Sequence, residues 1–354
     1  MNWSLSLGRI AGVKVLVHWT FLILLAWVFG ERLAAGAGVH AAIEMVLFVL
    51  AVFACVLLHE LGHALSARLY GVRTKFIVLL PIGGVANLES IPKKPLQELV
   101  IALAGPAVNV VIALLVFSAL LAFDRAVFAS RDAMVDSFVL RLALVNLFLV
   151  VFNMIPAFPM DGGRVLRALL AQALGRDRAT AIAAGVGQVC AVLFAIAGFY
   201  WNPILLLIAV LVFFGARAEA NSVRGESQLA GLTARDAMMT RFVTLDEHAT
   251  LARAREELLA GAQQDFPIVS GDAYRALLTR ADLLDALRNG LDERPAVALA
   301  RTDIHPASED EPLASIVASM QRFAVESFPV ASGGRLVGLL TRDNILEAVA
   351  VRRR

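Results

Sequence analysis

Long runs of apolar residues, separated by short polar stretches, dominate the first 217 positions of the chain. A helix needs about 20 apolar residues to cross the hydrocarbon core of a bilayer. The runs that suit this purpose are 16–36, 42–66, 97–123, 135–160, 179–200 and 203–217. The pattern therefore predicts a polytopic α-helical membrane domain, 1–217, with about six transmembrane helices. A polar stretch, 218–231, has the composition of a linker.

One stretch between the second and third apolar runs has a different character. Residues 72–89 are rich in β-branched side chains and too short to span a membrane as a helix, and they contain Pro81 and the pair Gly83-Gly84. These features predict either a β-hairpin at the interface or a re-entrant loop, and both readings stay open. A strand edge in this position could bind an extended substrate by strand addition.

The last third of the chain contains an internal repeat. Phe-Pro-Ile-Val at 266–269 recurs as Phe-Pro-Val-Ala at 328–331, and Leu-Leu-Thr-Arg at 277–280 recurs at 339–342. Both pairs are 62 residues apart, and a constant offset indicates two copies of one unit. Each copy reads as strand, helix, strand, strand, helix, which predicts a soluble α/β pair. The expected copies are 232–290 and 295–351.

Composition and charge agree with a membrane part followed by a soluble part. The chain is 59% hydrophobic and 18% charged, and its mean hydropathy is +0.73. A net charge of +2 gives no electrostatic reason to expect nucleic acid as a partner. Cys55 and Cys190 both fall in apolar runs, so no disulfide framework is expected. The first apolar run is expected to be a retained helix rather than a cleaved signal.

Basic residues predict the orientation of the chain in the membrane, because cytoplasmic loops are enriched in lysine and arginine. One side carries Arg9, Lys14, Arg68, Arg73, Lys75, Lys93, Lys94, Arg164, Arg167, Arg176, Arg178 and Arg217. The other side carries Arg32, Arg125 and Arg131. The sequence therefore predicts a multi-pass protein of the inner cell membrane with both termini in the cytoplasm.

The second apolar run ends in His59-Glu60-Leu61-Gly62-His63, an H-E-x-x-H motif. Histidines four residues apart lie on one face of a helix, so both imidazoles can reach one metal ion. Glu60, between them, can act as a general base toward water at that metal. Because the motif lies at the end of a membrane helix, it indicates a protease that cuts within the membrane.

Two histidines do not complete a hydrolytic zinc site, which usually has three protein ligands and one open position. Asp161 is a better candidate for the third ligand than the remaining histidines, because the predicted topology brings it to the same face of the membrane as His59. Pro156 and Pro159 interrupt the helix before it, and the glycines after it permit a sharp turn. A carboxylate at this depth is costly unless it is paired or bound to a metal.

These residues resemble the site-2 protease family of intramembrane zinc metalloproteases, in the prokaryotic branch with C-terminal tandem CBS domains. The family pattern N-x-x-P-x-x-P-x-D-G matches 153–162, and the segment 104–109 resembles a signature of the third helix. The resemblance implies one zinc ion per chain, held by His59, His63 and Asp161, with Glu60 as the general base. It implies that Asn153 contacts the substrate or the transition state.

Other residues are candidates for substrate contact. His18 lies near the cytoplasmic start of a membrane helix, where it either lines the active-site cavity or simply sits at the interface beside Trp19. Gly83 and Gly84 could pair with an unwound substrate strand. The family resemblance implies a transmembrane protein substrate, trimmed beforehand by another protease, in regulated intramembrane proteolysis; the lipid bilayer is the other partner.

The 62-residue repeat resembles tandem CBS domains, which commonly bind adenine nucleotides. In that family a Thr-x-x-Asp segment contacts ribose and phosphate. Thr279 and Asp282 match it, whereas the second copy pairs Thr341 with Asn344 in place of the aspartate. The resemblance implies ATP, ADP or AMP as a ligand that controls substrate access; the alternative is a pair used only to form a homodimer.

Two other functions compete with a protease. A CBS-gated metal transporter could use intramembrane histidine and aspartate to pass zinc. It would need neither Glu60 nor the proline-interrupted segment 153–159 before Asp161. An inactive relative that only binds membrane partners is the third reading, and the intact Glu60 argues against it.

Overall fold

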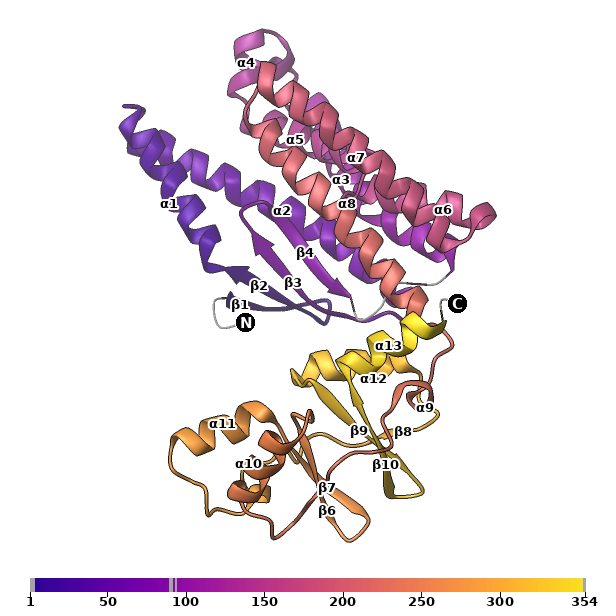
Figure 1. Cartoon of the computed structure of the whole chain (residues 1–354). Helices are drawn as coiled ribbons and strands as arrows, with labels where there is room; N and C mark the ends of the chain where they lie inside the picture. Colours follow the sequence, from indigo (N-terminus) through magenta and orange to yellow (C-terminus); the bar gives the residue numbers. More distant parts are fainter. Residues whose placement is uncertain (1–3, 89–91, 93, 353–354) are drawn as a thin grey trace. The chain divides into compact units, whose positions relative to one another are not determined.

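A computed structural model describes residues 4–88, 92 and 94–352, and divides the chain into two compact units, Met1–Val223 and Arg224–Arg354 (Figure 1). Lys93, one of the basic residues used to predict the orientation, and Glu89, the last residue of the predicted hairpin stretch, lie outside the described residues.

The first unit is mainly helical. Its helices are α1 (Trp19–Ala34), α2 (Gly38–Leu69), α3 (Pro95–Phe123), η1 (Arg125–Phe128), α4 (Arg131–Asp136), α5 (Phe138–Asn153), α6 (Asp161–Leu174), α7 (Arg176–Tyr200) and α8 (Ile204–Leu229). Local chemistry defines several of their starts. Pro95 is the first residue of α3, where its fixed φ suits a helix and its missing N–H costs nothing. The hydroxyl of Ser137 caps α5 by accepting from the N–H of Leu140.

Within the described residues, four helices are long and apolar enough to cross a membrane by length and composition: α2, α3, α7 and α8. The first and fourth apolar runs also form helices, α1 and α5, but of only 16 residues each, so the expected count of six is not confirmed. Large apolar side chains such as Leu115 and Phe214 are exposed on these helices. Extensive exposed apolar surface of this kind suits a lipid environment.

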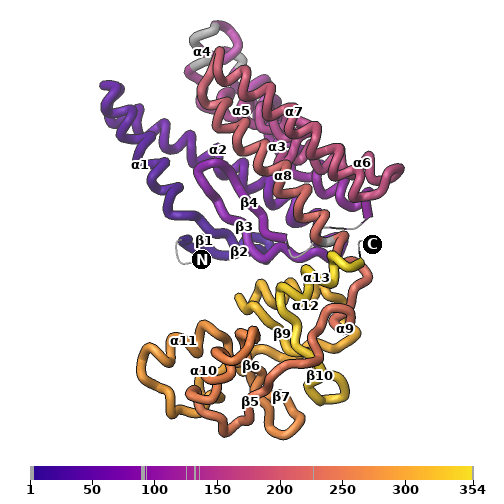
Figure 2. The backbone as a smooth tube through the Cα atoms, in the orientation of Figure 1, coloured from indigo at the N-terminus to yellow at the C-terminus, as the bar shows by residue number. Residues whose placement is uncertain are grey.

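A four-stranded sheet packs against α2 in the order β1-β2-β3-β4 (Figures 1 and 2). Its strands are β1 (Ser4–Ile10), β2 (Val13–His18), β3 (Thr74–Leu80) and β4 (Gly83–Leu88). The β3-β4 pair is antiparallel, so the glycine-containing stretch forms a hairpin. The sequence prediction began the first membrane helix at position 16 and is wrong there, because 13–18 pair in parallel with β3 across the connection through α1 and α2.

Glycine and small apolar residues let α2 pack closely on its neighbours. A Cβ at Gly62 would lie 2.8 Å from the carbonyl oxygen of Ala104 on α3, so only glycine permits this approach. On the other side, Leu61 and Ala64 of α2 form a buried cluster with Val13 and Ile77 of the sheet. The helix is thus held between α3 and the sheet, and this placement fixes the residues near its C-terminal end.

The second unit contains the two repeats, each folded as strand, helix, strand, strand, helix. The first has β5 (Leu245–Asp246), α10 (Leu251–Ala260), β6 (Phe266–Ser270), β7 (Ala273–Leu278) and α11 (Arg280–Arg288). The second has β8 (Ala307–Ser308), α12 (Leu313–Phe323), β9 (Ser327–Ser332), β10 (Arg335–Thr341) and α13 (Arg342–Arg352). Short helices α9 (Ala234–Ala237) and η2 (Ala296–Ala298) precede them. Each copy has its own three-stranded sheet.

The two copies exchange their leading segments. Leu232, Ala234 and Ala237 pack in the core of the second copy, and Met239 forms a bridge with Leu339. Residues 218–229, expected to be part of a linker, are the helical end of α8. Residues 218–229 are polar although they are helical. A helix makes its own backbone hydrogen bonds, so it can continue from an apolar into a polar environment without a break.

Candidate metal centre

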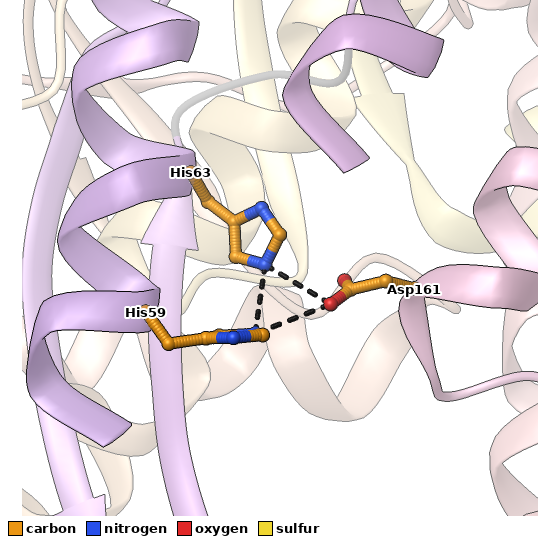
Figure 3. A group of neighbouring side chains, drawn as sticks. All are labelled: His59, His63 and Asp161. Atoms are coloured by element: carbon orange, nitrogen blue, oxygen red, sulfur yellow. Dashed lines mark hydrogen bonds and ion pairs between the residues drawn. The ribbon is translucent and has the colours of Figure 1, made fainter. Parts of the chain in front are cut away.

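Two buried histidines project from one face of α2. His59 and His63 are one helical turn apart, and their Nε2 atoms are 3.1 Å from each other (Figure 3). Both are nearly inaccessible to solvent. The H-E-x-x-H spacing thus does what helical periodicity predicts, and it places two nitrogen ligands side by side.

Asp161 comes from a different element and meets the histidines at the first position of α6. Its Oδ2 lies 3.2 Å from the Nε2 of each histidine (Figure 3). The first turn of α6 packs directly on the segment before it, 154–160, which Pro156 and Pro159 keep from being helical. A Cβ at Gly162 would lie 2.3 Å from the carbonyl oxygen of Ile155 in this segment. A Cβ at Gly163 would lie 2.6 Å from the nitrogen of Phe158. The two glycines are therefore what allows Asp161 to turn inward.

Hydrogen bonds on the far side of each imidazole decide which nitrogen is free. The Nδ1–H of His59 donates to Oδ1 of Asn109 at 2.5 Å, and that of His63 donates to the carbonyl of Ile101 at 2.7 Å. Each Nε2 in these neutral tautomers carries a lone pair rather than a proton. Two lone pairs and a carboxylate oxygen then converge without a hydrogen between them, an arrangement that a cation relieves.

The spacing of the three atoms fits zinc. With ligand bonds of about 2.05 Å, a tetrahedral zinc holds its ligand atoms about 3.3 Å apart. The observed separations are 3.1 and 3.2 Å, and in the described part of the chain this is the group of histidine, cysteine and acidic residues able to hold a metal. These two nitrogens and one oxygen would supply three ligands to a zinc ion, the number that hydrolytic zinc sites usually take from the protein.

A buried chain of amides continues from His59 away from the site. The Nδ2 of Asn109 donates to Oδ1 of Asn146 at 2.7 Å, and Asn146 in turn donates to Sγ of Cys55 and to the carbonyl of Leu142. Both asparagines are fully buried. Partners of this kind fix the tautomer and ring orientation of a metal ligand. From the sequence, Asn109 is recognisable only as part of a family signature, and Asn146 was not predicted. The available signal for Asn146 is an asparagine in a predicted membrane helix.

The backbone of α3 closes one side of the site at Gly105. A Cβ there would lie 2.2 Å from Nε2 of His63 and 2.7 Å from Nε2 of His59. Any side chain at this position would occupy the space toward which both lone pairs point. Gly105 thus forms part of the cradle for the cation, a role that the sequence reasoning did not assign.

Glu60 lies beside the hairpin. A Cβ at Gly84 in β4 would lie 2.7 Å from Cγ of Glu60, so the strand passes directly over this carboxylate side chain. Gly83 precedes it with φ of 135°, a backbone conformation that suits glycine. The structure therefore brings the predicted base and the predicted substrate strand together.

Two further candidates have local roles in the structure. Asn153 ends α5 and donates to the carbonyl of Leu149 at 3.0 Å; across the described residues no hydrogen bond joins it to His59, His63 or Asp161. The Nδ1 of His18 caps α1 by accepting from the N–H of Thr20 and lies 2.7 Å from its hydroxyl. Substrate contact by Asn153 and His18 stays a prediction.

The candidate nucleotide residues occupy matching places in the two copies of the second unit. Thr279 accepts from the N–H of Asp282 and its hydroxyl lies 2.6 Å from Oδ2 of that aspartate. Thr341 and Asn344 repeat the arrangement at the same distance. Both threonines thus cap a helix, α11 in the first case, and this role needs no ligand.

Comparisons with known proteins find similar families and relatives for both parts of the chain. The chain matches peptidase family M50 at residues 47–130 and 122–197, and the CBS domain family at 234–289 and 296–351. It is 33% identical to zinc metalloprotease MJ0392 of Methanocaldococcus jannaschii, over 99% of this chain and 97% of that one. It is 29% identical to Rip3 of Mycobacterium tuberculosis, over 100% of this chain and 94% of that one.

Among solved structures, the chain is similar to the site-2 protease from Methanocaldococcus jannaschii. The sequence identity is 37%, the TM-score is 0.47, and the match covers 62% of this chain and 95% of that chain.

Proposed function

Because the chain belongs to peptidase family M50 and is a site-2 protease-like zinc metalloprotease with a CBS pair, we propose that it cleaves peptide bonds in or near the transmembrane segments of other membrane proteins. The observation that carries this proposal is the convergence of His59, His63 and Asp161 at the end of a long apolar helix, with Glu60 next to a strand.

His59, His63 and Asp161 would hold one zinc ion per chain. When bound, the ion supplies a Lewis acid that polarises the scissile carbonyl and lowers the pKa of water. Glu60 accepts the proton of the attacking water and passes it to the leaving amine. Asn109 and the Ile101 carbonyl hold the two imidazoles in the tautomer that leaves Nε2 free.

The hairpin supports a way to hold the substrate. A transmembrane helix hides its amide groups in its own hydrogen bonds, so it must unwind locally before it can be cut. In the order of the described strands β4 is at an edge of the sheet. An unwound segment that pairs with β4 at Gly83 and Gly84 would run past Glu60. We assign Asn153 and His18 to the walls of the same path.

The membrane setting is proposed from the charges and the helices. The basic residues of the chain gather on one side of the apolar runs, which supports a multi-pass protein of the inner membrane with both termini in the cytoplasm. The substrate would be a single-span protein already trimmed by another protease. The proposal includes no nucleic acid partner, in line with the small net charge.

The experiment for this proposal maps where the peptide bond is cut. The full chain and its Glu60→Gln variant are reconstituted in vesicles with a single-span test substrate, and the products are identified by mass spectrometry. We expect wild-type products that end inside the hydrophobic segment and none from the variant. Products that end only in the tails outside the membrane would contradict intramembrane cleavage, and equal cleavage by both proteins would contradict the role of Glu60.

For the CBS pair we propose adenine nucleotide binding at Thr279 and Asp282, with control of substrate access as its effect and a homodimer as its setting. The matching residues of the second copy are Thr341 and Asn344, where the missing carboxylate leaves a weaker site. A ligand can regulate only if it binds two conformers with different affinities.

Calorimetry of the full chain with ATP, ADP and AMP tests this assignment. Heat that is lost in Asp282→Asn and kept in the matched variant Asn344→Asp supports it. The absence of heat with all three nucleotides would leave the pair as a dimerisation module.

A further inference from the structure

A buried arginine lies on the helix that begins with Asp161 but is not among the candidate metal ligands. The side chain of Arg167, on α6, is fully buried. Its Nε donates to Oε1 of Glu98 at 2.7 Å, its Nη2 donates to the same oxygen, and its Nη1 donates to Oε1 of Glu219. Its guanidinium also lies over the ring of Phe158, 5.0 Å from the ring centre. Each of its three nitrogens therefore donates to a carboxylate, and one face of the planar group is covered by a ring.

Net stability is a weak explanation for this cluster. Removing a guanidinium and a carboxylate from water costs about as much as their attraction returns, and apolar residues of the same volume often do as well. Buried ion pairs are instead able to specify one arrangement of the elements that carry them.

The cluster joins the two halves of the metal site. Glu98 is on α3, one turn before Ile101, whose carbonyl orients His63. Arg167 is on α6, the helix that begins with Asp161. The pair thus connects the turn that orients a histidine ligand to the helix that presents the carboxylate ligand.

The contact with Phe158 fixes Asp161 from the other direction. Phe158 is buried in the segment 154–160, three residues before Asp161, and its backbone packs on Gly163 just after it. Arg167 therefore braces the chain on both sides of the aspartate, once through the aromatic ring and once through the helix itself.

Resting on the proposed zinc site, we infer that Arg167 is a positioning residue for it: through Glu98 and Phe158 it sets the distance between Asp161 and the two histidines. The bond to Glu219 adds α8 to the same cluster, but α8 carries no ligand. The two carboxylates therefore have unequal effects on the metal, and Glu98 has the larger one.

The test measures metal affinity rather than cleavage alone. Zinc is withdrawn from the full chain by a competing chelator in wild type, Arg167→Lys, Glu98→Gln and Glu219→Gln. Lysine keeps the charge but cannot donate to two carboxylates in fixed directions. We expect the affinity to fall about 10- to 100-fold in Arg167→Lys and Glu98→Gln, the usual effect of altering an outer-shell partner, because glutamine keeps an accepting oxygen but loses the charge that holds the guanidinium. The fall should be smaller in Glu219→Gln. The control is Arg217→Lys on α8, an exposed arginine, with no change expected.

Cobalt substitution separates positioning from general stabilisation. The d–d absorption of bound cobalt reports ligand geometry, and we expect it to change in Glu98→Gln and in Phe158→Leu, which keeps apolar volume but removes the ring. These two variants carry the test if Arg167→Lys does not fold. Wild-type zinc affinity and an unchanged cobalt spectrum in Glu98→Gln and Phe158→Leu would overturn the inference. Loss of zinc from the wild type itself would instead overturn the proposed site.

Discussion

Replacing Gly105 by alanine is the sharpest structural test of the metal cradle. The added methyl carbon would lie 2.2 Å from Nε2 of His63, 2.5 Å from its Cε1 and 2.7 Å from Nε2 of His59. An ordinary contact needs about 3.5 Å, so the methyl group would overlap both imidazoles by roughly 1 Å. It would stand where the two lone pairs converge.

The cost of this overlap can be worked from the surrounding bonds. To make room, His59 and His63 must turn, and turning breaks their Nδ1–H bonds to Asn109 and to the Ile101 carbonyl. A buried polar group left without its partner costs about 1–3 kcal/mol. Two such losses cost at least about 2 kcal/mol, which corresponds to a fall in zinc affinity of at least about 30-fold, because about 1.4 kcal/mol is tenfold.

The assay is zinc content after dialysis, with cleavage of a test substrate and thermal unfolding measured on the same samples. Gly185→Ala is the matched control: Gly185 lies in helix α7 and a Cβ there meets nothing within 4 Å. Alanine in a helix interior is about 1 kcal/mol more favourable than glycine, so this control should keep its zinc and unfold no earlier than wild type. A Gly105→Ala protein with a full complement of zinc and wild-type cleavage would refute the reasoning.

Three further predictions concern other parts of the molecule. Asn146→Leu should lower zinc affinity about 10-fold, because Asn109 loses the bond that directs its oxygen to His59; chelator competition measures this. Gly84→Val should leave zinc in place but reduce the turnover rate, since the new side chain displaces Glu60, and single-turnover cleavage separates the two effects. In the CBS pair, Asp265→Asn should destabilise the fold by about 1–3 kcal/mol in denaturant unfolding, because the buried carboxylate accepts two hydrogen bonds.

Each of these has its own control. Cys55→Ser changes the far end of the amide chain and should alter zinc affinity less than Asn146→Leu does. Val85→Ile alters an exposed neighbour of Gly84 and should leave turnover unchanged. Asp272→Asn removes an exposed carboxylate and should leave unfolding within about 0.5 kcal/mol of wild type. An effect of the control as large as that of its partner would contradict the corresponding explanation.

The metal centre could be predicted from the sequence because each of its two parts is a local pattern. Four-residue spacing places His59 and His63 on one face of a helix, and the prolines and glycines around Asp161 mark a turn at the same predicted depth. The repeat in the second unit was equally visible, since a constant offset needs no knowledge of the fold. These predictions need only patterns along the chain and the expected depth of each segment in the membrane.

The features missed depend on residues far apart in the chain. The parallel pairing of β2 with β3 joins positions about 60 apart, so residues 16–18 of the strand were predicted to be the start of an apolar helix. Arg167 was expected among solvated loop charges, because nothing near it shows that Glu98 and Glu219 come to meet it. The hydrogen bond between Asn146 and Asn109 likewise forms only because α5 packs on α3.

The most direct test of the account is bound zinc and substrate cleavage measured together in purified wild type and Glu60→Gln. The geometry places Glu60 outside the set of ligand atoms, so the substitution should leave zinc untouched. We predict one zinc per chain in both proteins and cleavage by the wild type alone. Zinc in neither protein would contradict the metal centre, and zinc in both with cleavage by both would contradict Glu60 as the general base.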